Sequence, residues 1–350
     1  MASRTRPSTV RCFRIPLVGR FWQRMITVLF SSAGRRTELL NCFRHDALLL
    51  GESLRVLAVD VQPEFSAACH SADASFKAPH CLGDGFIPRL LEICQHENVE
   101  LLVPTIDTEL EVLADAQDIF AAIGTRVHIS SPEVVRIARD KAATARFLAG
   151  AGLPAPQTGT VPAVLRAPDA WRWPLILKPI AGSSSVGICI ARDLEEFQVA
   201  ARVRDDLLAQ EYWIGREFTI NIFFDQTGKL RCAIPHWRKE TRAGEVSKGI
   251  TWRHPLLMHL SDQLGSVLQG ARGALCFQAI VTDSGEAAIF EINARFGGGY
   301  PLAHQAGGTF SKWLLEEALG RACSATNEWR DRLMMLRYDA ALFAAARSEP

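Results

Sequence analysis

The sequence predicts a mixed α/β protein in which a parallel-sheet domain precedes an α+β region. Residues 26–130 alternate between apolar, strand-like runs and amphipathic, helix-like runs, as expected for a parallel sheet covered on both faces. Residues 219–237 and 275–296 each read as a β-hairpin, with a long helix between them. We therefore expect domains at 25–130 and 131–320, a leader at 1–24 and a carboxy-terminal extension at 321–350.

Composition excludes several classes of protein. Of the 350 residues, 48% are hydrophobic and 22% are charged, which is typical of globular proteins with two or three sub-domains. No apolar run approaches the roughly 18 residues that a membrane span requires, and a net charge of +1 gives no reason to expect nucleic acid. The nine cysteines are scattered and contain no CxxC pair, so we expect a reducing cytoplasm rather than disulfides or a zinc site.

The first 24 residues differ from the rest of the chain. They contain six arginines and no acidic residue, and they lack the continuous apolar stretch of a secretory signal. A dispensable, disordered leader before Met25 is the interpretation we favour, and a transit peptide is the alternative.

The elements of the first region follow in order. "ITVLFSS", "LRVLAVDV", "VELLVPT" and "RVHIS" read as strands, and "RRTELLNCFRHDALLL", "FIPRLLEICQHE" and "ELEVLADAQDIFAAIG" as helices. "SSAGRR" follows the first strand, where dinucleotide-binding proteins carry a glycine-rich turn, and Asp60 closes the second strand. Only Gly34 is present, so the three-glycine fingerprint is not met and a nicotinamide cofactor is not expected.

The second region begins with two helices. Ser131 followed by Pro132 and Glu133 indicates a helix start, and the glycines at 150 and 152 end the second helix. Residues 174–237 then read as strand-rich, interrupted by a helix at 194–209, and a further helix is expected near 255–272.

The stretch "LILKPIAGSSSVGICI" places a lysine at the end of an apolar strand, directly before a loop of small residues. Lys178 is a point charge that suits a phosphate, and Gly182 and Gly187 allow backbone amides to approach an anion closely. The lysine precedes the glycines, so this is not a P-loop. A flexible hairpin turn is the alternative for the loop taken alone.

The stretch "FEINARF" alternates Glu291, Asn293 and Arg295 on one face of a strand. Carboxylate and amide oxygens suit Mg²⁺, and a guanidinium suits phosphate or carboxylate oxygens. Gln278 interrupts the apolar strand before it and requires a partner if buried. An exposed polar hairpin face is the alternative.

A third stretch, "QEYWIGREFTINIF", carries Glu211 and Glu217 on either side of a short turn. Backbone groups at 211–214 could recognise adenine, and the Glu217 carboxylate could bind ribose. The alternative is that both are surface glutamates without a binding role, which would give the same sequence pattern.

Taken together, these stretches resemble the ATP-grasp superfamily, most closely its carbamoyl-phosphate synthase large-chain-like and carboxylate–amine ligase branch. The resemblance covers about residues 26–320 and includes a Rossmann-like, pre-ATP-grasp domain at the amino terminus. "SSAGRR" and "FGGGYPLAHQAGG" are similar to small stand-alone members of the superfamily. Many ligases of the superfamily carry an acid where this chain has Gln278, whereas the synthase-like members also have a glutamine.

The resemblance implies a role for each of these residues. It implies a mobile lid at about 155–213, with a phosphate-covering loop at 182–187, and catalytic roles for Lys178 and for Arg295, which would stabilise the transferring phosphoryl group. The implied ATP-binding residues are Lys141, Lys178, Gly182, Ser183, Ser184, Ser185, Val186, Gly187, Glu211, Tyr212, Trp213, Ile214 and Glu217, and the implied metal ligands are Gln278, Glu291 and Asn293.

The implied activity is ATP- and Mg²⁺- (or Mn²⁺-) dependent ligation of a carboxylate to an amine or ammonia through an acyl phosphate. Phosphorylation of bicarbonate or carbamate, as in carbamoyl-phosphate synthases, and a non-catalytic ATP-binding regulator are the alternatives. The expected partners are small molecules, with a homodimer as a reasonable state and a partner glutaminase left open.

The carboxylate substrate needs cationic partners beside the nucleotide. The stretch "HWRKETRAGEVSKGITWRH" offers several, and the alternative is a solvated charged loop. A histidine in "YPLAHQAGG" could also touch substrate, although a structural role is the plainer interpretation. The substrate candidates are Arg238, Arg242, Lys248, Arg253 and His304.

Overall fold

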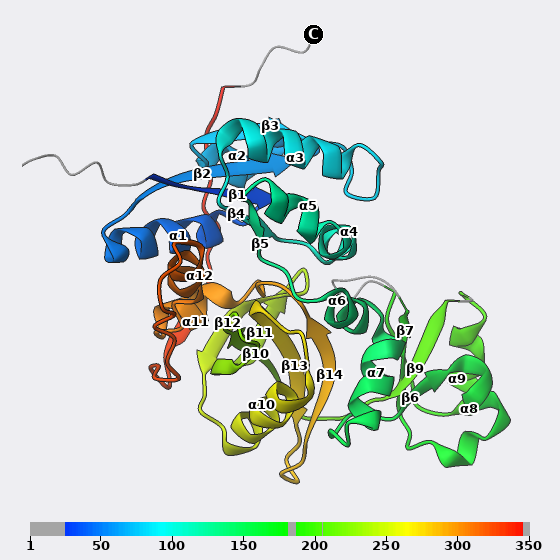
Figure 1. Ribbon diagram of the computed structural model, residues 1–350. Helices are drawn as coiled ribbons and strands as arrows, with labels where there is room; N and C mark the ends of the chain where they lie inside the picture. The colour runs from blue at the N-terminus through cyan, green and yellow to red at the C-terminus, as the bar shows by residue number, and fades with distance from the viewer. Residues whose placement is uncertain (1–24, 181–186, 205, 346–350) are drawn as a thin grey trace, which may run out of the picture.

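Three β-sheets follow one another along the chain in the computed structural model, which describes residues 25–180, 187–204 and 206–345 (Figure 1). A five-stranded sheet comes first, a four-stranded sheet second and a six-stranded sheet last. The predicted mixed α/β class, with a parallel amino-terminal sheet, is confirmed.

The first sheet has the order β3-β2-β1-β4-β5, and its strand pairs are all parallel. Its central strands are buried on both faces: Val28 and Phe30 pack into one core, and Leu29 packs into another. Its elements are β1 (Met25–Ser31), α1 (Thr37–Leu50), β2 (Ser53–Asp60), η1 (Pro63–Phe65), α2 (Ala67–Ser71), β3 (Ala74–Lys77), α3 (Phe86–Glu97), β4 (Leu101–Pro104), η2 (Asp107–Glu109), α4 (Leu110–Asp115), α5 (Gln117–Ala122) and β5 (Arg126–Val127).

Two helices connect this domain to the rest of the chain. Ser131 caps α6 (Pro132–Arg139) as predicted, because its Oγ accepts a hydrogen bond from Val134 N at 3.4 Å. Asp140 caps α7 (Lys141–Gly150) by accepting from Ala142 N at 2.7 Å. The cap fixes Lys141 as the first residue of α7.

The second sheet is antiparallel and has the order β6-β9-β7-β8. The helix expected at 194–209 is wrong in its second half, since residues 207–211 form a central strand. Leu207 and Ala209 are buried in that strand, so packing between two neighbouring strands overrides the helical pattern. The elements are β6 (Thr158–Thr160), α8 (Val161–Arg166), η3 (Pro168–Ala170), β7 (Leu175–Pro179), β8 (Cys189–Ala191), α9 (Leu194–Ala201) and β9 (Leu207–Glu211).

The third sheet is antiparallel and has the order β14-β13-β10-β11-β12-β15. Both predicted hairpins are confirmed, as β10–β11 and β13–β14. The predicted helix near 255–272 ends at Val267. The elements are β10 (Arg216–Phe224), β11 (Leu230–Arg242), β12 (Glu245–Thr251), α10 (Pro255–Val267), β13 (Gly273–Val281), β14 (Ala287–Asn293), α11 (Tyr300–Gln305), α12 (Phe310–Ala318) and β15 (Met334–Leu336).

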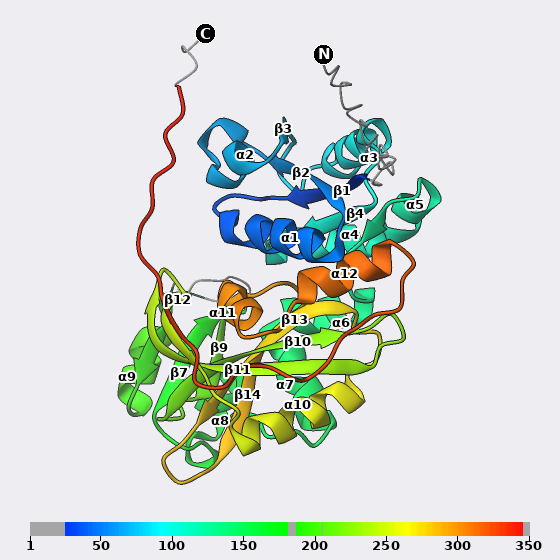
Figure 2. The same cartoon turned by 90° about the vertical axis from the view of Figure 1, so that its left-hand side faces the viewer.

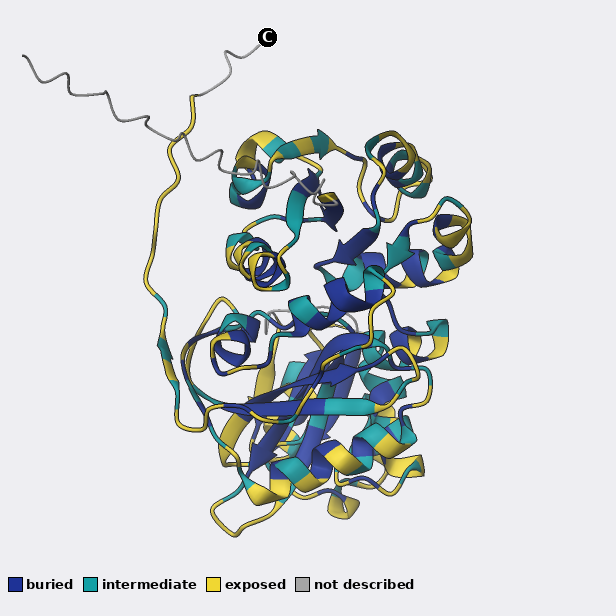
Figure 3. Ribbon diagram, turned by 60° about the vertical axis from the view of Figure 1, so that its left-hand side comes forward, coloured by how far each residue is buried: buried dark blue, intermediate teal, exposed yellow. Residues whose placement is uncertain are grey.

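The first and third sheets share a hydrophobic core. Phe43 of α1 packs with Phe30 and Phe296, and Trp313 and Leu314 of α12 belong to the same cluster. Figure 2 shows α12 directly beneath α1, and Figure 3 shows that the strands of the third sheet are largely buried. The carboxy-terminal residues after β15 run past β12 toward the first sheet (Figure 2).

Two further expectations concern the chain as a whole. Among the described helices, none has the length and apolar character needed to cross a bilayer. The eight cysteines within the described residues are all free thiols. The leader expected at 1–24 lies outside the described residues.

Candidate nucleotide-binding site

A cleft of about 530 Å³ lies where the three sheets meet. The first domain contributes Asp107, the four-stranded sheet contributes Lys178, and the ends of β13 and β14 contribute oxygen-bearing side chains. Eight of the predicted site residues line this one cleft: Lys141, Lys178, Glu217, Arg238, Gln278, Glu291, Asn293 and Arg295.

Lys178 is a buried cation at the wall of the cleft. It is 6% exposed, and its Nζ donates to Gln210 Oε1 at 2.9 Å. The pKa of Lys178 is lowered to about 8, chiefly by burial; the Glu291 carboxylate opposes the shift and the positive charge of Lys141 adds to it. A charge that is poorly solvated at the wall of the cleft is well placed to bind an anion.

Lys141 faces the same cleft from the amino terminus of α7. Burial lowers the pKa of Lys141, whereas the nearby charge of Glu291 acts in the opposite direction. Two lysines separated by 37 positions in the sequence therefore share one carboxylate neighbour, an arrangement that suits a polyanion such as a triphosphate together with its metal.

Gln210 is a cleft residue that sequence reasoning missed. Its side chain lies between Lys178 and Thr158, because Nε2 donates to Thr158 Oγ1 at 2.7 Å while Oε1 accepts from the lysine. The strand that carries Gln210 was not predicted, because the sequence over 194–209 indicated a helix. Its polar character in "LLAQE", between buried residues, was the available signal.

Oxygen donors gather at the end of the β13–β14 hairpin. Gln278 stands opposite Glu291 in the strand register, and Asn293 Nδ2 donates to Glu291 Oε1 at 3.0 Å. The carboxylate of Glu291 and the amide oxygen of Asn293 are the hard ligands that Mg²⁺ prefers, so this donor set fits the metal. Gln278 Oε1 accepts from Arg238 Nη1 at 2.6 Å, which ties it to a cation.

Arg295 is held by the first domain. Its Nη2 donates to Asp107 Oδ2 at 2.5 Å, and its Nη1 donates to the Phe296 carbonyl at 3.0 Å. The buried carboxylate of Glu109 fixes the turn that carries Asp107 by accepting from Thr105 N at 2.7 Å. Sequence reasoning missed Asp107, since nothing near it in the sequence points to a partner 188 positions away.

Glu217 and Arg238 lie on neighbouring strands at the cleft wall. Glu217 Oε2 is 3.8 Å from Arg238 Nε, and half of the Glu217 side chain is exposed to the cleft and solvent. Arg238 also donates to the Gly244 carbonyl at 3.1 Å. An exposed carboxylate beside the cleft is compatible with the predicted contact to ribose.

The predicted adenine segment lies around a separate, smaller cavity of about 310 Å³. Glu211 accepts there from Arg172 N at 3.3 Å and from Trp213 Nε1 at 3.4 Å. The Tyr212 amide donates to the Pro174 carbonyl. The side chains of Glu211, Tyr212, Trp213 and Ile214 all line this smaller cavity, and Gln210 is the neighbour that faces the main cleft.

The loop predicted to cover the phosphates falls largely outside the described residues. Gly182, Ser183, Ser184, Ser185 and Val186 belong to that undescribed stretch. Gly187 is described and has a φ of +75°, which a residue with a side chain rarely adopts. Pro179 and Ile188, on either side of the loop, line the cleft.

Of the substrate candidates in "HWRKETRAGEVSKGITWRH", Arg238 lines the main cleft. Arg242 pairs with Asp339 beside a second cavity. Lys248 pairs with Glu240 at 2.7 Å on an exposed strand, and Arg253 lies over the Trp329 ring at 4.0 Å. The structure thus places Lys248 and Arg253 away from the cleft.

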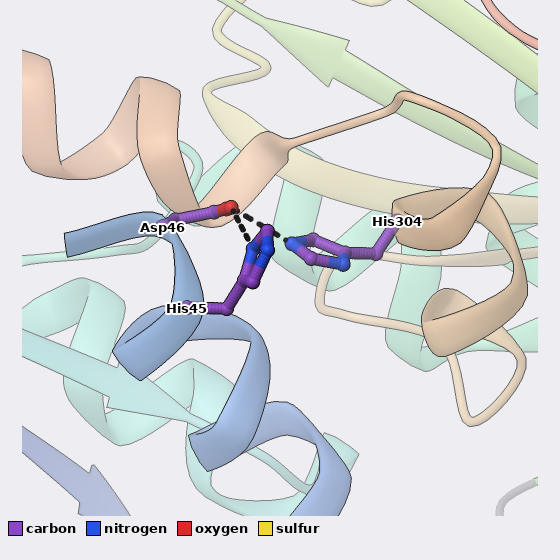
Figure 4. Close-up of side chains that lie close together, drawn as sticks. All are labelled: His45, Asp46 and His304. Atoms are coloured by element: carbon purple, nitrogen blue, oxygen red, sulfur yellow. Dashed lines mark hydrogen bonds and ion pairs between the residues drawn. The ribbon is translucent and has the colours of Figure 1, made fainter. Parts of the chain in front are cut away.

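His304 lies in a buried contact between the two domains. Its Nε2 is 3.0 Å from Asp46 Oδ1 on α1, and His45 Nδ1 is 3.2 Å from the same oxygen (Figure 4). The other carboxylate oxygen accepts from Ser311 Oγ at 2.5 Å and from Lys312 N at 2.9 Å. We call Asp46 with these four partners the interdomain latch. His304 lines neither of the two large cavities, so the structure gives it a packing role.

A polar cleft thus lies between two antiparallel sheets and beside a parallel-sheet domain. Residues 138–299 match the family described as "ATP-grasp domain", and residues 28–128 match "PylC-like, N-terminal domain". The chain thus contains an ATP-grasp domain and a PylC-like amino-terminal domain.

Among proteins of known function, the chain is similar to D-alanine–D-alanine ligases. It is 30% identical over 210 residues to the enzyme of Cereibacter sphaeroides, which covers 57% of this chain and 59% of that protein. It is 30% identical over 155 residues to the enzyme of Halorhodospira halophila, with 42% and 48% covered. The chain thus spans about half of the length of the relatives that it matches.

Solved structures share the fold at low identity. The biotin carboxylase domain of 2-oxoglutarate carboxylase from Hydrogenobacter thermophilus, in complex with MgADP and bicarbonate, matches with a TM-score of 0.70 and 19% identity, covering 88% of this chain and 73% of that one. L-amino acid ligase from Bacillus licheniformis matches with a TM-score of 0.65 and 16% identity, covering 85% and 75%.

Proposed function

We propose that the protein is an ATP- and Mg²⁺-dependent ligase that activates a carboxylate as an acyl phosphate and joins it to an amine or ammonia. The observation that carries this proposal is the convergence of Lys141, Lys178, Glu291, Asn293 and Arg295 on one cleft. The relatives named as D-alanine–D-alanine ligases support the same reaction class.

The first step is phosphoryl transfer. A carboxylate oxygen of the substrate attacks the γ-phosphorus of ATP, the bond between that phosphorus and the bridging oxygen breaks, and ADP leaves. Such a transfer depends mainly on alignment and on neutralising charge. Lys141 and Lys178 bind phosphate oxygens, and Arg295, oriented by Asp107, faces the phosphoryl group.

Glu291 and Asn293 are the residues that would hold Mg²⁺, with Gln278 next to them on the opposite strand. When bound, the metal supplies a positive charge that neutralises phosphate oxygens during transfer. Because Gln278 is hydrogen-bonded to Arg238, we assign it the lesser part in metal binding.

The second step forms the carbon–nitrogen bond. The nitrogen lone pair attacks the carbonyl carbon of the acyl phosphate, the carbon–oxygen bond to phosphate breaks, and inorganic phosphate leaves. The nitrogen loses one proton in forming the amide. Acyl phosphates hydrolyse readily, so the reaction needs a site that excludes water, which a closed four-stranded sheet region acting as a lid would provide.

The direct test is a ligation screen with the full chain, Mg²⁺ and ATP against pooled acids and amines, read by mass spectrometry and by ADP release. We expect ADP release that requires a carboxylate, together with a product whose mass equals acid plus amine minus water. Lys178→Ala serves as the inactive control. Binding of MgATP without carboxylate-dependent ADP release across the panel would instead favour a non-catalytic regulator.

A further inference from the structure

A second cavity, of about 540 Å³, opens beside the main cleft and shares residues with it. The common residues include Arg35, Arg36, Glu245 and the backbone of Gly297 and Gly298. We call this second cavity the side chamber. Since Arg295 stands just before those glycines in the chain, the side chamber adjoins the place where an acyl phosphate would form.

The glycine floor of the side chamber is tightly packed. A Cβ added to Gly298 would lie 2.6 Å from Glu245 Cδ, so the Glu245 side chain would have to move to admit one. Gly297 and Gly298 therefore present backbone to both cavities.

The far wall of the side chamber comes from the carboxy-terminal segment. β15 pairs with β12 as the edge strand of the third sheet, and Arg337 N continues the pairing by donating to the Ser247 carbonyl at 2.8 Å. Residues 337–342 line the side chamber from there. Arg337 also donates through Nη2 to the Gly298 carbonyl, so this segment is fixed to the glycine floor.

Three arginines surround a single carboxylate inside the side chamber. Glu245 is 3.2 Å from Arg36 Nη1, 2.9 Å from Arg337 Nη1 and 3.8 Å from Arg35 Nη2. Burial acts to raise the pKa of Glu245, but these arginines outweigh it and lower the pKa, so the carboxylate is ionised at neutral pH. Over the whole lining of the side chamber, four arginines face three carboxylates, which leaves an excess of one positive charge.

That excess needs an anionic partner. Arg36 is largely buried, and burial lowers its pKa, which means that its charge is poorly solvated. Guanidinium groups bind carboxylates through paired hydrogen bonds. Glu38, Glu245 and Asp339, also in the lining, provide acceptors for an ammonium group.

We propose that the side chamber binds the amine co-substrate, and that this co-substrate carries a carboxylate of its own, gripped by Arg36 and Arg337, as in an α-amino acid. This rests on the ligase activity proposed above. The amino group would point past Gly297 and Gly298 toward the acyl phosphate. Arg337, contributed by the carboxy-terminal segment, is then a residue that determines specificity.

The test measures binding by the full chain in the presence of MgADP, using saturation-transfer NMR with free α-amino acids, their primary amides and aminoethyl phosphate as probes. We expect at least one free amino acid to bind about tenfold or more tightly than its amide, as loss of a charge-assisted hydrogen bond predicts. Equal binding of acid and amide, or no binding of any amino acid, would overturn the proposal. Tighter binding of aminoethyl phosphate would overturn the choice of a carboxylate.

Matched variants distinguish the contribution of Arg36 and Arg337 to carboxylate binding from general effects of substitution on the protein. Arg337→Gln should remove the preference for acid over amide, Arg337→Lys should retain part of it, and Arg321→Gln should leave it intact because Arg321 pairs with Glu52 outside both cavities. An unchanged preference in both Arg337→Gln and Arg36→Gln would contradict the assignment. Binding is measured without turnover, so the two proposals can fail separately. Selective binding without any ligation would refute only the proposed ligase activity. Ligation without a preference for acid over amide would refute only the proposed role of the side chamber.

Discussion

At the scale of single residues, Lys178 shows how a binding residue weakens the fold that holds it. Lys178 is 6% exposed, and its ammonium group donates a hydrogen bond to Gln210. A charge in this position is better solvated by bound phosphate than by the protein alone. The residue is therefore expected to favour the nucleotide complex at the expense of the free protein.

Replacement of Lys178 by methionine tests this balance. We expect Lys178→Met to abolish nucleotide binding and to stabilise the nucleotide-free protein by on the order of 1 kcal/mol at neutral pH, because the lost desolvation penalty exceeds one hydrogen bond. Chemical denaturation with and without MgATP measures both effects. A variant that is destabilised and still binds ATP would contradict the role assigned to the lysine.

The same lysine predicts a pH dependence. Its pKa falls from 10.5 to about 8 in the folded state, so the unfolded chain binds more protons between these two values. The wild-type free energy of unfolding should therefore rise with pH across that window relative to Lys178→Met. Denaturation curves of both proteins at several pH values, without nucleotide, measure the difference. A constant difference would show that Lys178 titrates normally.

Glu291 carries the proposed metal site. Glu291→Gln keeps the shape of the side chain but removes the charge, so we expect normal folding and a loss of Mg²⁺-dependent ADP release of about 100-fold or more. Glu286→Gln, on the exposed turn of the same hairpin, is the control and should retain activity. A Mg²⁺ titration that is the same in Glu291→Gln and in wild type would rule out Glu291 as a ligand.

At the scale of elements, the three glycines at 297–299, which follow β14, pack closely against neighbouring side chains. A Cβ on Gly299 would lie 2.6 Å from Nε2 of His236, whose ring is fully buried and cannot move aside. The bond between Asn221 Nδ2 and His236 Nδ1, at 3.2 Å, fixes that ring further. The glycine run is thus a packing requirement as well as a floor for the two cavities.

Gly299→Ala should consequently destabilise the protein by about 1–3 kcal/mol through overpacking. Gly150→Ala is the matched control, since Gly150 ends a helix with nothing within 4 Å of an added Cβ, and it should be neutral or slightly stabilising. Thermal unfolding of the two variants provides the comparison. Equal stability of Gly299→Ala and wild type would mean that His236 is free to shift.

An element can be predicted from the sequence where its apolar residues recur at a regular spacing. α3 was expected at Phe86–Glu97 and lies there, because its apolar positions recur at helical spacing and Asn98 ends it in a left-handed conformation. β3 was not predicted, since its four residues are only partly buried at the edge of the sheet. The helix expected over 109–124 is divided at Ala116 into α4 and α5, a break that no glycine or proline marks.

Some residues of the candidate site could likewise be predicted from the sequence, and others could not. Lys178 and the alternating Glu291, Asn293 and Arg295 could be predicted, because polar groups at the ends of apolar strands are conspicuous in a sequence. Asp107 and Glu245 could not, since each is an ordinary acidic residue until the fold brings distant arginines to it. Long-range pairing depends on tertiary structure and leaves no local pattern.

At the scale of the whole molecule, the interdomain latch joins the first and third sheets. Burial acts to raise the pKa of Asp46, but the hydrogen bonds from His304 and Ser311 outweigh it, and the net pKa is lowered. A carboxylate with a depressed pKa stabilises the fold fully above its unfolded value of 3.8 and loses that contribution as the pH falls through the folded pKa.

Asp46→Asn should therefore lower the free energy of unfolding at neutral pH by about 2–4 kcal/mol. The difference from wild type should shrink as the pH falls below about 3.8, because the unfolded wild-type chain then binds a proton that the folded Asp46 carboxylate does not. Urea denaturation at pH 7 and in the acid range measures both values. A difference that is independent of pH would mean that shape rather than charge holds the two domains together.

The contact between Asp107 and Arg295 has a consequence for how the two domains can be exchanged. The guanidinium of Arg295, which we propose faces the transferring phosphoryl group, is oriented by a residue that belongs to the PylC-like domain. A chimera that joins this ATP-grasp domain to a foreign amino-terminal domain could fold and bind ATP, yet leave Arg295 without its anchor. Compatibility of the two halves thus depends on this salt bridge as well as on the interdomain latch and the shared core, and recombination libraries built on this protein should keep that pair together.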